Sequence, residues 1–376
     1  MAISITSRFE CGNIRVLEAD DVSDIRLEIE SDGKAEFFQW FFYRVEAPDG
    51  FRRMRLVNAA RASYAQGWDG YAACASYDLA TWFRVPTRYE DGQLVIEHEA
   101  HGPVCYYAYF APYTAHDAMR MTARTAGADG VTWLPLGHSL DGRPIEALRF
   151  GDAADVKRRI WVIARQHPGE SMGSWFAEGF CEGLLNPESK MAEALLRSAT
   201  VYVVPMMNPD GVARGHLRTN AAGTDLNRAW AEPTVEASPE VLSVLGAMDE
   251  TGCDLFLDAH GDEVIANTFI AGSEGIPSWS PRLAELLSTF KNQLIEATPD
   301  FQDKDGYPID PAGKANMRIA CNAVAERFDC LSMTLEMPFK DAQSNPKPEE
   351  GWSPRRSKEL ARHTIDVMSR LAPRLR

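Results

Sequence analysis

The first third of the chain alternates between apolar and polar residues in short runs. Examples are IRLEIE, RMRLVNAA and GQLVIEHEA, and turn-forming pairs of Asp and Gly separate many of these runs. Alternation with a period of two is typical of half-buried β-strands, and closely spaced turns favour a sandwich or a barrel. We therefore predict an all-β sandwich domain over residues 1–115.

From residue 116 onward, short apolar runs alternate with longer stretches of helical periodicity. This pattern is typical of an α/β domain, in which helices cover a parallel or mixed sheet. We predict such a domain over residues 116–376, with strands at 145–150, 160–164, 200–204, 255–258, 268–271 and 332–336. Helices are expected at 115–127, 171–185, 190–199, 238–250, 281–297 and 354–371.

Composition and charge exclude several classes of function. The chain has no apolar run of roughly 18 residues and no basic N-terminal segment leading into an apolar one, so we expect neither a membrane span nor a secretory signal. A formal net charge of −15 disfavours binding to nucleic acid. The seven cysteines are scattered and form no C-x-x-C pair, which indicates reduced thiols in a cytoplasmic protein. The oligomeric state stays open.

Two histidines and a glutamate stand where predicted strands end. His167 and Glu170 follow one strand, and His260 ends another. In α/β proteins ligands bind outside the carboxyl ends of the strands, and two His with one Glu suffice to hold a catalytic zinc that keeps water in its fourth position. The H-x-x-E pair alone is a weak signal, because chance produces one easily in a chain with eight histidines. Taken alone, His260 equally fits a histidine bonded to backbone at the edge of the core.

A zinc site that hydrolyses an amide also needs a base, an oxyanion partner and substrate anchors. Glu336 interrupts an apolar strand and is the candidate base, with a buried ion pair to an arginine as the alternative. Arg218 can stabilise an oxyanion, and Arg228 with Asn227 can grip a carboxylate through the planar guanidinium. Asp225 can accept a hydrogen bond from a zinc-bound histidine. For Arg218, Asn227 and Arg228, a surface salt bridge is the commoner explanation.

With these residues in view, the sequence resembles the zinc metallocarboxypeptidases, and among them the cytosolic carboxypeptidases. The motifs that carry the resemblance occur in the family's order and are HPGE at 167–170, NPDG at 208–211, G-x-DLNR-x-W at 223–230, DAHG at 258–261 and TLEM at 334–337. The resemblance covers nearly the whole chain, because QWFFYRV at 39–45 and YFAPYT at 109–114 resemble the β-sandwich domain that marks the cytosolic group.

The resemblance implies an α/β catalytic domain with a mixed sheet of the phosphorylase/hydrolase-like type. It also implies one zinc ion (Zn2+) per chain, and it gives each candidate residue a role: zinc ligands His167, Glu170 and His260, general base Glu336, carbonyl-polarising Arg218, carboxylate anchors Asn227 and Arg228, and Asp225 behind the first zinc histidine. These implied roles agree with those argued from the residues themselves.

The resemblance leaves the substrate open. Pancreatic-type relatives close a mobile tyrosine over the substrate, and Tyr307 is the sole Tyr candidate because it is the only tyrosine after Tyr202. Eukaryotic cytosolic relatives trim acidic C-terminal residues. The segment GKANMRIA resembles their basic segment, so Lys314 and Arg318 are candidates for an acidic preference, and both equally fit solvated loop residues.

The expected function is therefore a cytoplasmic zinc carboxypeptidase that acts on the C-terminal tails of peptides or proteins. Two alternatives stay open. The first is an aspartoacylase-like or desuccinylase-like amidohydrolase acting on small N-acyl amino acids, against which the NPDG motif and the β-rich N-terminal part argue. The second is a noncatalytic peptide-binding protein, against which Glu336 and the complete ligand set argue.

Overall fold

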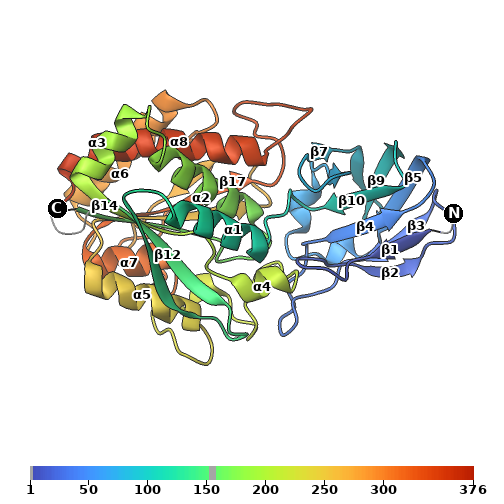
Figure 1. The fold of residues 1–376 in the computed structure, drawn as a ribbon, viewed down its shortest axis with the longest axis horizontal. Helices are drawn as coiled ribbons and strands as arrows, with labels where there is room; N and C mark the ends of the chain where they lie inside the picture. The colour runs from blue at the N-terminus through green and yellow to red at the C-terminus, as the bar shows by residue number, and fades with distance from the viewer. Residues whose placement is uncertain (1–2, 152–157) are drawn as a thin grey trace.

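The computed structural model of the protein describes residues 3–151 and 158–376. Its elements form a β-rich N-terminal part and a larger α/β part, which lie side by side in an elongated molecule with the two termini at opposite ends (Figure 1). Strands β1 to β10 belong to the first part, and helix α1 (Ala115–Ala126) is the first element of the second.

The N-terminal part consists of two five-stranded sheets. The first has the order β1-β4-β10-β6-β7 and the second β2-β3-β5-β9-β8. The strands of the first are β1 (Ser4–Thr6), β4 (Phe42–Glu46), β6 (Cys74–Ser76), β7 (Phe83–Arg84) and β10 (Val104–Ala108). Those of the second are β2 (Arg15–Glu18), β3 (Ile25–Glu28), β5 (Gly50–Leu56), β8 (Thr87–Glu90) and β9 (Gln93–Ala100). Aromatic pairs such as Tyr43 stacked on Tyr107 fill its core, as expected for an all-β domain.

The second part is built on a seven-stranded mixed sheet with the order β11-β12-β14-β13-β15-β17-β16. Strands β14, β13, β15 and β17 are neighbours in this order and run parallel to one another. Strands β11, β12 and β16 are antiparallel to their neighbours. The strands are β11 (Val131–His138), β12 (Pro144–Phe150), β13 (Arg158–Ala164), β14 (Ala199–Val204), β15 (Leu255–Asp262), β16 (Phe269–Ala271) and β17 (Leu331–Pro338). The parallel strands are buried along almost all of their length, because helices cover both faces of the sheet.

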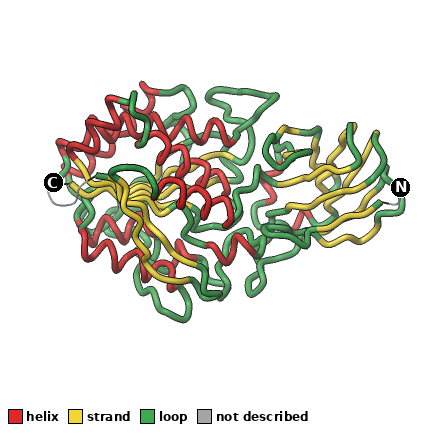
Figure 2. Tube along the Cα trace, viewed as in Figure 1, coloured by secondary structure: helices red, strands yellow, loops and turns green. Residues whose placement is uncertain are grey.

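Helices lie on both faces of this sheet (Figure 2). One layer contains α2 (Ser171–Leu184), α3 (Lys190–Ser198), α6 (Pro281–Ala297) and α8 (Pro354–Leu371), and the other contains α5 (Pro239–Thr251) and α7 (Ala320–Phe328). The short helix α4 (Pro209–Ala213) lies close to α1. Within residues 3–151 and 158–376, no helix combines the length and the apolar character needed to cross a membrane.

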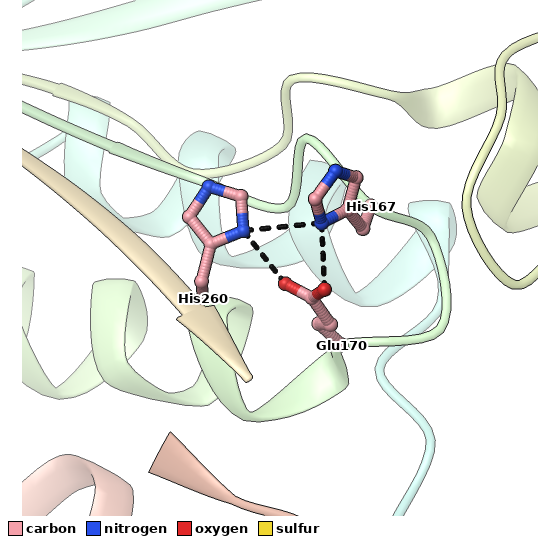
Figure 3. A group of neighbouring side chains, drawn as sticks. All are labelled: His167, Glu170 and His260. Carbon is pink, nitrogen blue, oxygen red and sulfur yellow. Dashed lines mark hydrogen bonds and ion pairs between the residues drawn. The ribbon is translucent and has the colours of Figure 1, made fainter. Parts of the chain in front are cut away.

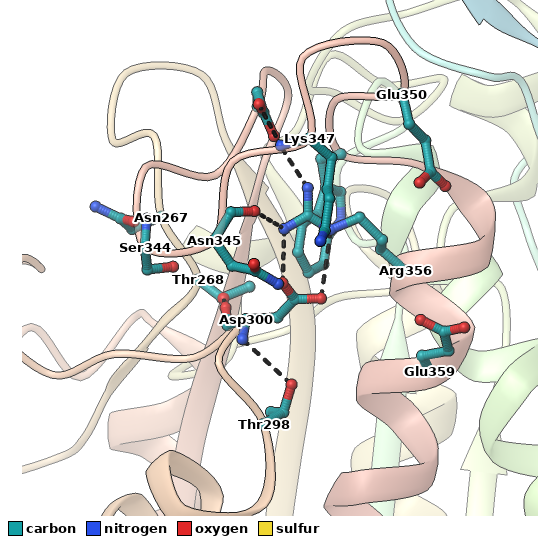
Figure 4. Close-up of polar contacts among 12 residues, drawn as sticks. Asn267, Thr268, Thr298, Asp300, Ser344, Asn345, Lys347, Glu350, Arg356 and Glu359 are labelled. Carbon is teal, nitrogen blue, oxygen red and sulfur yellow. Dashed lines mark hydrogen bonds and ion pairs between the residues drawn. The ribbon is translucent and has the colours of Figure 1, made fainter.

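A buried arginine ties helix α8 to the loops beside it (Figure 4). Arg356 is 1% exposed, and its guanidinium lies 2.6 Å from Asp300 and 3.0 Å from Asp341. It also donates to the backbone carbonyl of Asn345 at 2.9 Å and lies 4.7 Å from the ring centre of Trp352. A buried charge is tolerated only when it is paired and hydrogen-bonded, and this one is. Since α8 packs along α2, the contacts of Arg356 also help to hold these two helices in place.

All predicted strands and helices are present, with small displacements of their ends. Strand β11 and helices α4 and α7 were not predicted. The main correction concerns His260, which was expected to end a strand. It lies inside β15, because that strand continues beyond the apolar run and pairs with β17 as far as Asp262 and Pro338.

Candidate active site

The site is assembled by neighbouring strands of the mixed sheet. Strands β15 and β17 are parallel neighbours, and their register places His260 directly beside Glu336. Paired residues of adjacent strands point to the same face of a sheet, so the imidazole and the carboxylate share one face. On the other side of β15, strand β13 leads into the loop that carries His167, and Glu170 stands at the N-cap position of α2. The order and register of the strands thus bring together four residues from three distant segments of the chain.

Three side chains converge on one point (Figure 3). His167 Nδ1 lies 2.6 Å from Glu170 Oε1, His260 Nδ1 lies 2.8 Å from Glu170 Oε2, and the two Nδ1 atoms are 3.2 Å apart. All three side chains are buried, and their ligand atoms lie within 4.8 Å of one another. One ion can therefore contact all three at the usual zinc distances of about 2 Å.

The far nitrogen of each imidazole faces a carboxylate. His167 Nε2 lies 3.0 Å from Asp225 Oδ1, and His260 Nε2 lies 2.8 Å from Asp258 Oδ2, although the second contact is too bent for a hydrogen bond. A carboxylate in this place favours the tautomer with its proton on Nε2, which leaves a lone pair on Nδ1. Two such lone pairs at 3.2 Å from each other, beside the carboxylate of Glu170, can bind one cation together. The donor set therefore fits zinc.

Asp225 connects the metal ligands to the substrate side of the site. Its carboxylate also accepts from Arg218 Nε at 2.8 Å and from the backbone N–H of Asn227 at 3.0 Å. Burial alone would raise the pKa of Asp225, but its contacts with His167 and Arg218 outweigh burial and hold this pKa well below its ordinary value. The ionised Asp225 thus keeps the guanidinium of Arg218 beside the metal ligands.

Glu336 faces the same space with one unpaired oxygen. Among the described residues its Oε2 has no hydrogen-bond partner, and its Oε1 lies 3.2 Å from the hydroxyl oxygen of Tyr307. The same hydroxyl lies 2.6 Å from Asp262 Oδ2. Burial, partly offset by His260 and reinforced by Glu170, raises the pKa of Glu336 to about 8. A carboxyl whose pKa lies near neutrality is suited to proton transfer at physiological pH.

The predicted substrate-binding residues divide into two groups. Asn227, Arg228 and Tyr307 line a cleft of about 470 Å³ that also contains the metal ligands His167 and Glu170, Arg218 and Glu336. Within the described parts of the chain, Lys314 and Arg318 are not among the residues that line it. Lys314 is exposed, and Arg318 directs its Nε to the backbone carbonyl of Arg228 at 2.9 Å.

The N-terminal part contributes Tyr64 to the cleft and holds the loop that carries Arg218. Tyr64 lines the cleft, and its ring centre lies 5.8 Å from the guanidinium of Arg218. The carboxylate of Asp32, 3% exposed, accepts the backbone N–H groups of Leu217 at 2.6 Å, Arg218 at 2.9 Å and Thr219 at 2.8 Å. Sequence reasoning missed both residues, because contacts between distant segments leave no local pattern.

We expect Asp32→Asn to weaken the protein and its activity together. The amide places a donor against three backbone donors, and hydrogen bonds to a charged group contribute about 1.5–3 kcal/mol. We expect a loss of about 2 kcal/mol in the free energy of unfolding and a fall in kcat/KM, because the loop no longer holds Arg218. Denaturant titration and peptide kinetics measure both. Asp20→Asn, at an exposed position of the same part, is the control. Unchanged stability and kinetics in Asp32→Asn would contradict the role of this contact.

Comparison with known families agrees with this geometry. Residues 5–110 match the cytosolic carboxypeptidase N-terminal domain family, and residues 119–343, more than half of the chain, match the zinc carboxypeptidase family. The chain belongs to the zinc carboxypeptidase family. The resemblance predicted from the motifs is thereby confirmed, and the family is one of peptide hydrolases that use zinc, in agreement with the His-Glu-His cluster.

Individual relatives extend the family match to the full length. An uncharacterized protein of Zymomonas mobilis is 44% identical over the whole chain and 98% of its own length. A metallo-carboxypeptidase from Pseudomonas aeruginosa, solved in complex with (2-guanidinoethylmercapto)succinic acid, is 46% identical with a TM-score of 0.97, over 99% of this chain and 100% of that one. Cytosolic carboxypeptidase 2 of Macaca fascicularis is 29% identical over 71% of this chain. The chain matches only 36% of that longer protein.

Proposed function

We propose that this zinc carboxypeptidase removes single C-terminal residues from peptides or protein tails. The observation that carries the proposal is an arginine in the cleft of the metal ligands, Arg228, whose guanidinium donates to the backbone carbonyl of Asn227 at 2.8 Å but has no ion-pair partner among the described residues. An arginine grips a carboxylate through two parallel hydrogen bonds, so Arg228 with Asn227 suits the terminal carboxylate of a peptide.

The other residues then have defined roles. A zinc ion held by His167, Glu170 and His260 supplies Lewis acidity, which polarises a carbonyl group and lowers the pKa of water. Glu336 takes a proton from the attacking water and passes it to the leaving amine. Arg218 offers its guanidinium to the developing oxyanion. The hydroxyl of Tyr307 lies 3.2 Å from Glu336 Oε1 in the same cleft, which supports a role for this tyrosine in covering the bound residue.

The nature of the removed residue is a separate question. The ligand of the Pseudomonas relative is a succinic acid and so carries carboxyl groups, which supports a cleft that binds small carboxylates. A preference for acidic C-terminal residues rested on Lys314 and Arg318, whose side chains do not line the cleft in the described structure. An acidic preference therefore stays a prediction, and a scan of the last residue tests it.

A direct test compares peptides with free and amidated C-termini by mass spectrometry. We expect loss of one residue from the free peptide and none from its amide, because the amide offers no anion to Arg228. N-acyl amino acids assayed alongside the peptides test the amidohydrolase alternative, and binding of the free peptide without any release favours the noncatalytic one.

All seven cysteines are free of disulfide bonds, which supports a reducing, cytoplasmic setting for the reaction.

A further inference from the structure

A buried glutamate lines the cleft at the point where it meets the N-terminal part. Glu263 directly follows strand β15, is 6% exposed and is one of the residues that line the cleft. The short 3-10 helix η2 (Ala65–Trp68) of the N-terminal part packs closely against it, because a Cβ atom on Gly67 would lie 2.6 Å from the backbone oxygen of Glu263. Glu263 therefore lies between the metal-binding strand and the N-terminal part.

The carboxyl group of Glu263 has no partner. Within residues 3–151 and 158–376, no group of another residue forms a hydrogen bond or an ion pair with it. Its neighbour Asp262, by contrast, accepts the hydroxyl of Tyr307 at 2.6 Å and a backbone N–H at 2.8 Å. Burial, reinforced by Glu170 and Asp262 and opposed by Arg218, raises the pKa of Glu263 well above its ordinary value. A carboxyl group buried in this way is stabilised as an anion when a cation comes against it.

The protein's own cations near Glu263 are already engaged. The guanidinium of Arg218, which acts on the pKa of Glu263, is paired with Asp225 at 2.8 Å. The ammonium of Lys340 reaches the other side of η2, where it donates to the backbone carbonyl of Asp69 at 2.7 Å. Neither cation forms an ion pair with Glu263, so a cation that satisfies this carboxyl group has to come from a ligand in the cleft.

The two ends of a bound peptide face different parts of the cleft. Arg228, proposed to hold the terminal carboxylate, stands in a loop that Asn227 joins to the first residue of helix α7 through a hydrogen bond of 2.9 Å. Arg218, proposed to face the carbonyl group that is attacked, lies beside Tyr64 of the N-terminal part. A peptide held at both points runs from α7 toward the N-terminal part. The residue before the cleaved bond therefore approaches the region where Tyr64 and Glu263 line the cleft.

Covalent geometry limits which peptides bring a cation to this place. The α-nitrogen of the residue before the cleaved bond lies about 2.5 Å from the carbonyl carbon that is attacked, and each further residue moves the amino end away by up to about 3.6 Å. In a dipeptide this α-nitrogen is a free ammonium group. In a longer peptide it belongs to an uncharged amide. A carboxyl group near this position therefore distinguishes a dipeptide from a long tail.

We propose that the enzyme prefers dipeptides, and that Glu263 binds their free α-ammonium group. The inference rests on the proposed exopeptidase function and names its substrate class. Hydrogen bonds between charged groups are about twice as strong as those between neutral groups, and the low dielectric of a buried site strengthens them further. A long tail places an uncharged amide at this point and leaves the buried carboxyl group without a cation, so Glu263 favours dipeptides and disfavours tails.

The test uses zinc-loaded protein with a dipeptide and a pentapeptide that share one C-terminal residue, the one that the scan finds removed fastest. Each is compared with its desamino form, in which propionyl replaces an N-terminal alanyl residue and only the amine is lost. We expect the amine to raise kcat/KM by about 10-fold to 100-fold in the dipeptide and by less than about threefold in the pentapeptide. Glu263→Gln should abolish this gain and leave the desamino dipeptide within about threefold. Glu240→Gln, at a buried glutamate outside the cleft, is the matched control.

A lysine side chain is the other source of an ammonium group in a peptide. An N-acetylated pentapeptide with lysine or alanine before the cleaved bond tests this source. We expect the two to differ in kcat/KM by less than about threefold, because the lysine ammonium lies at the end of a four-carbon stem, far from the α-nitrogen. A gain from lysine as large as the gain from the amine of the dipeptide would overturn the assignment of Glu263 to the amino end.

The outcomes separate this inference from the function beneath it. If the wild type cleaves the dipeptide and its desamino form equally well, or if Glu263→Gln keeps the wild-type ratio between them, the role of Glu263 is overturned while the exopeptidase function stands. The wild-type ratio needs no variant, so the inference remains falsifiable even if Glu263→Gln does not fold. If no peptide loses its last residue, the proposed function itself fails.

Discussion

Glu336→Gln is expected to give a folded, zinc-binding protein whose turnover falls about 1,000-fold, within the range measured for the loss of a general base. The amide keeps the size of the side chain but cannot accept a proton. The unpaired Oε2 is buried at the cleft and its strand partner is His260, so no described acceptor is better placed to take the proton of a water at the metal ligands. The measurements are kcat on a peptide with a free C-terminus, zinc content and thermal unfolding.

The control for this variant is a second buried glutamate. Glu240 is fully buried at the start of α5, and burial raises its pKa to about 7. It lies outside the cleft and accepts from Asn220 Nδ2 at 3.2 Å, a bond that glutamine can also accept. We expect Glu240→Gln to keep most of the turnover. If Glu336→Gln keeps more than about a tenth of it, which is far above the expected loss, another group acts as the base.

The residues of the motifs come together in the structure because they lie on elements that the sheet places side by side. HPGE follows a central strand, DAHG lies within the next, and TLEM lies within its neighbour, so a correct strand order places their side chains side by side. The position of Asp258 beside the site could have been predicted in the same way. It stands two residues before His260 and hence on the same face of the strand.

Other parts of the site depend on side-chain direction and on contacts between distant segments. Lys314 and Arg318 have the charges that an acidic preference needs, but the loop turns Arg318 toward the backbone of Arg228. Asp32 lies 185 positions from the loop that it holds, and its surroundings resemble any turn of the β domain. Periodicity and motifs carry none of this information.

Removal of the metal is expected to abolish turnover and to lower the unfolding temperature by several degrees. A ligand that binds only the folded state stabilises it by about 4 kcal/mol when its free concentration is roughly 1,000 times its dissociation constant. The folded state holds the buried carboxylate of Glu170 against the imidazoles of His167 and His260, whose facing nitrogens are 3.2 Å apart. Zinc bound by these three groups stabilises the folded state, and a chelator removes this stabilisation. Dialysis against a chelator, followed by calorimetry with and without added zinc, measures the shift.

Variants of single histidines show whether that shift comes from this site. His260→Ala removes one of three ligands and leaves the other two buried, so we expect no bound zinc, no turnover and an unfolding temperature that added zinc does not change. His138→Ala, on the exposed edge strand β11, should keep the zinc-dependent shift in full. Zinc binding retained by His260→Ala, or a chelator-treated wild type with an unchanged unfolding temperature, would place the metal elsewhere. Because the readout is stability, the result holds whatever peptide the enzyme cleaves.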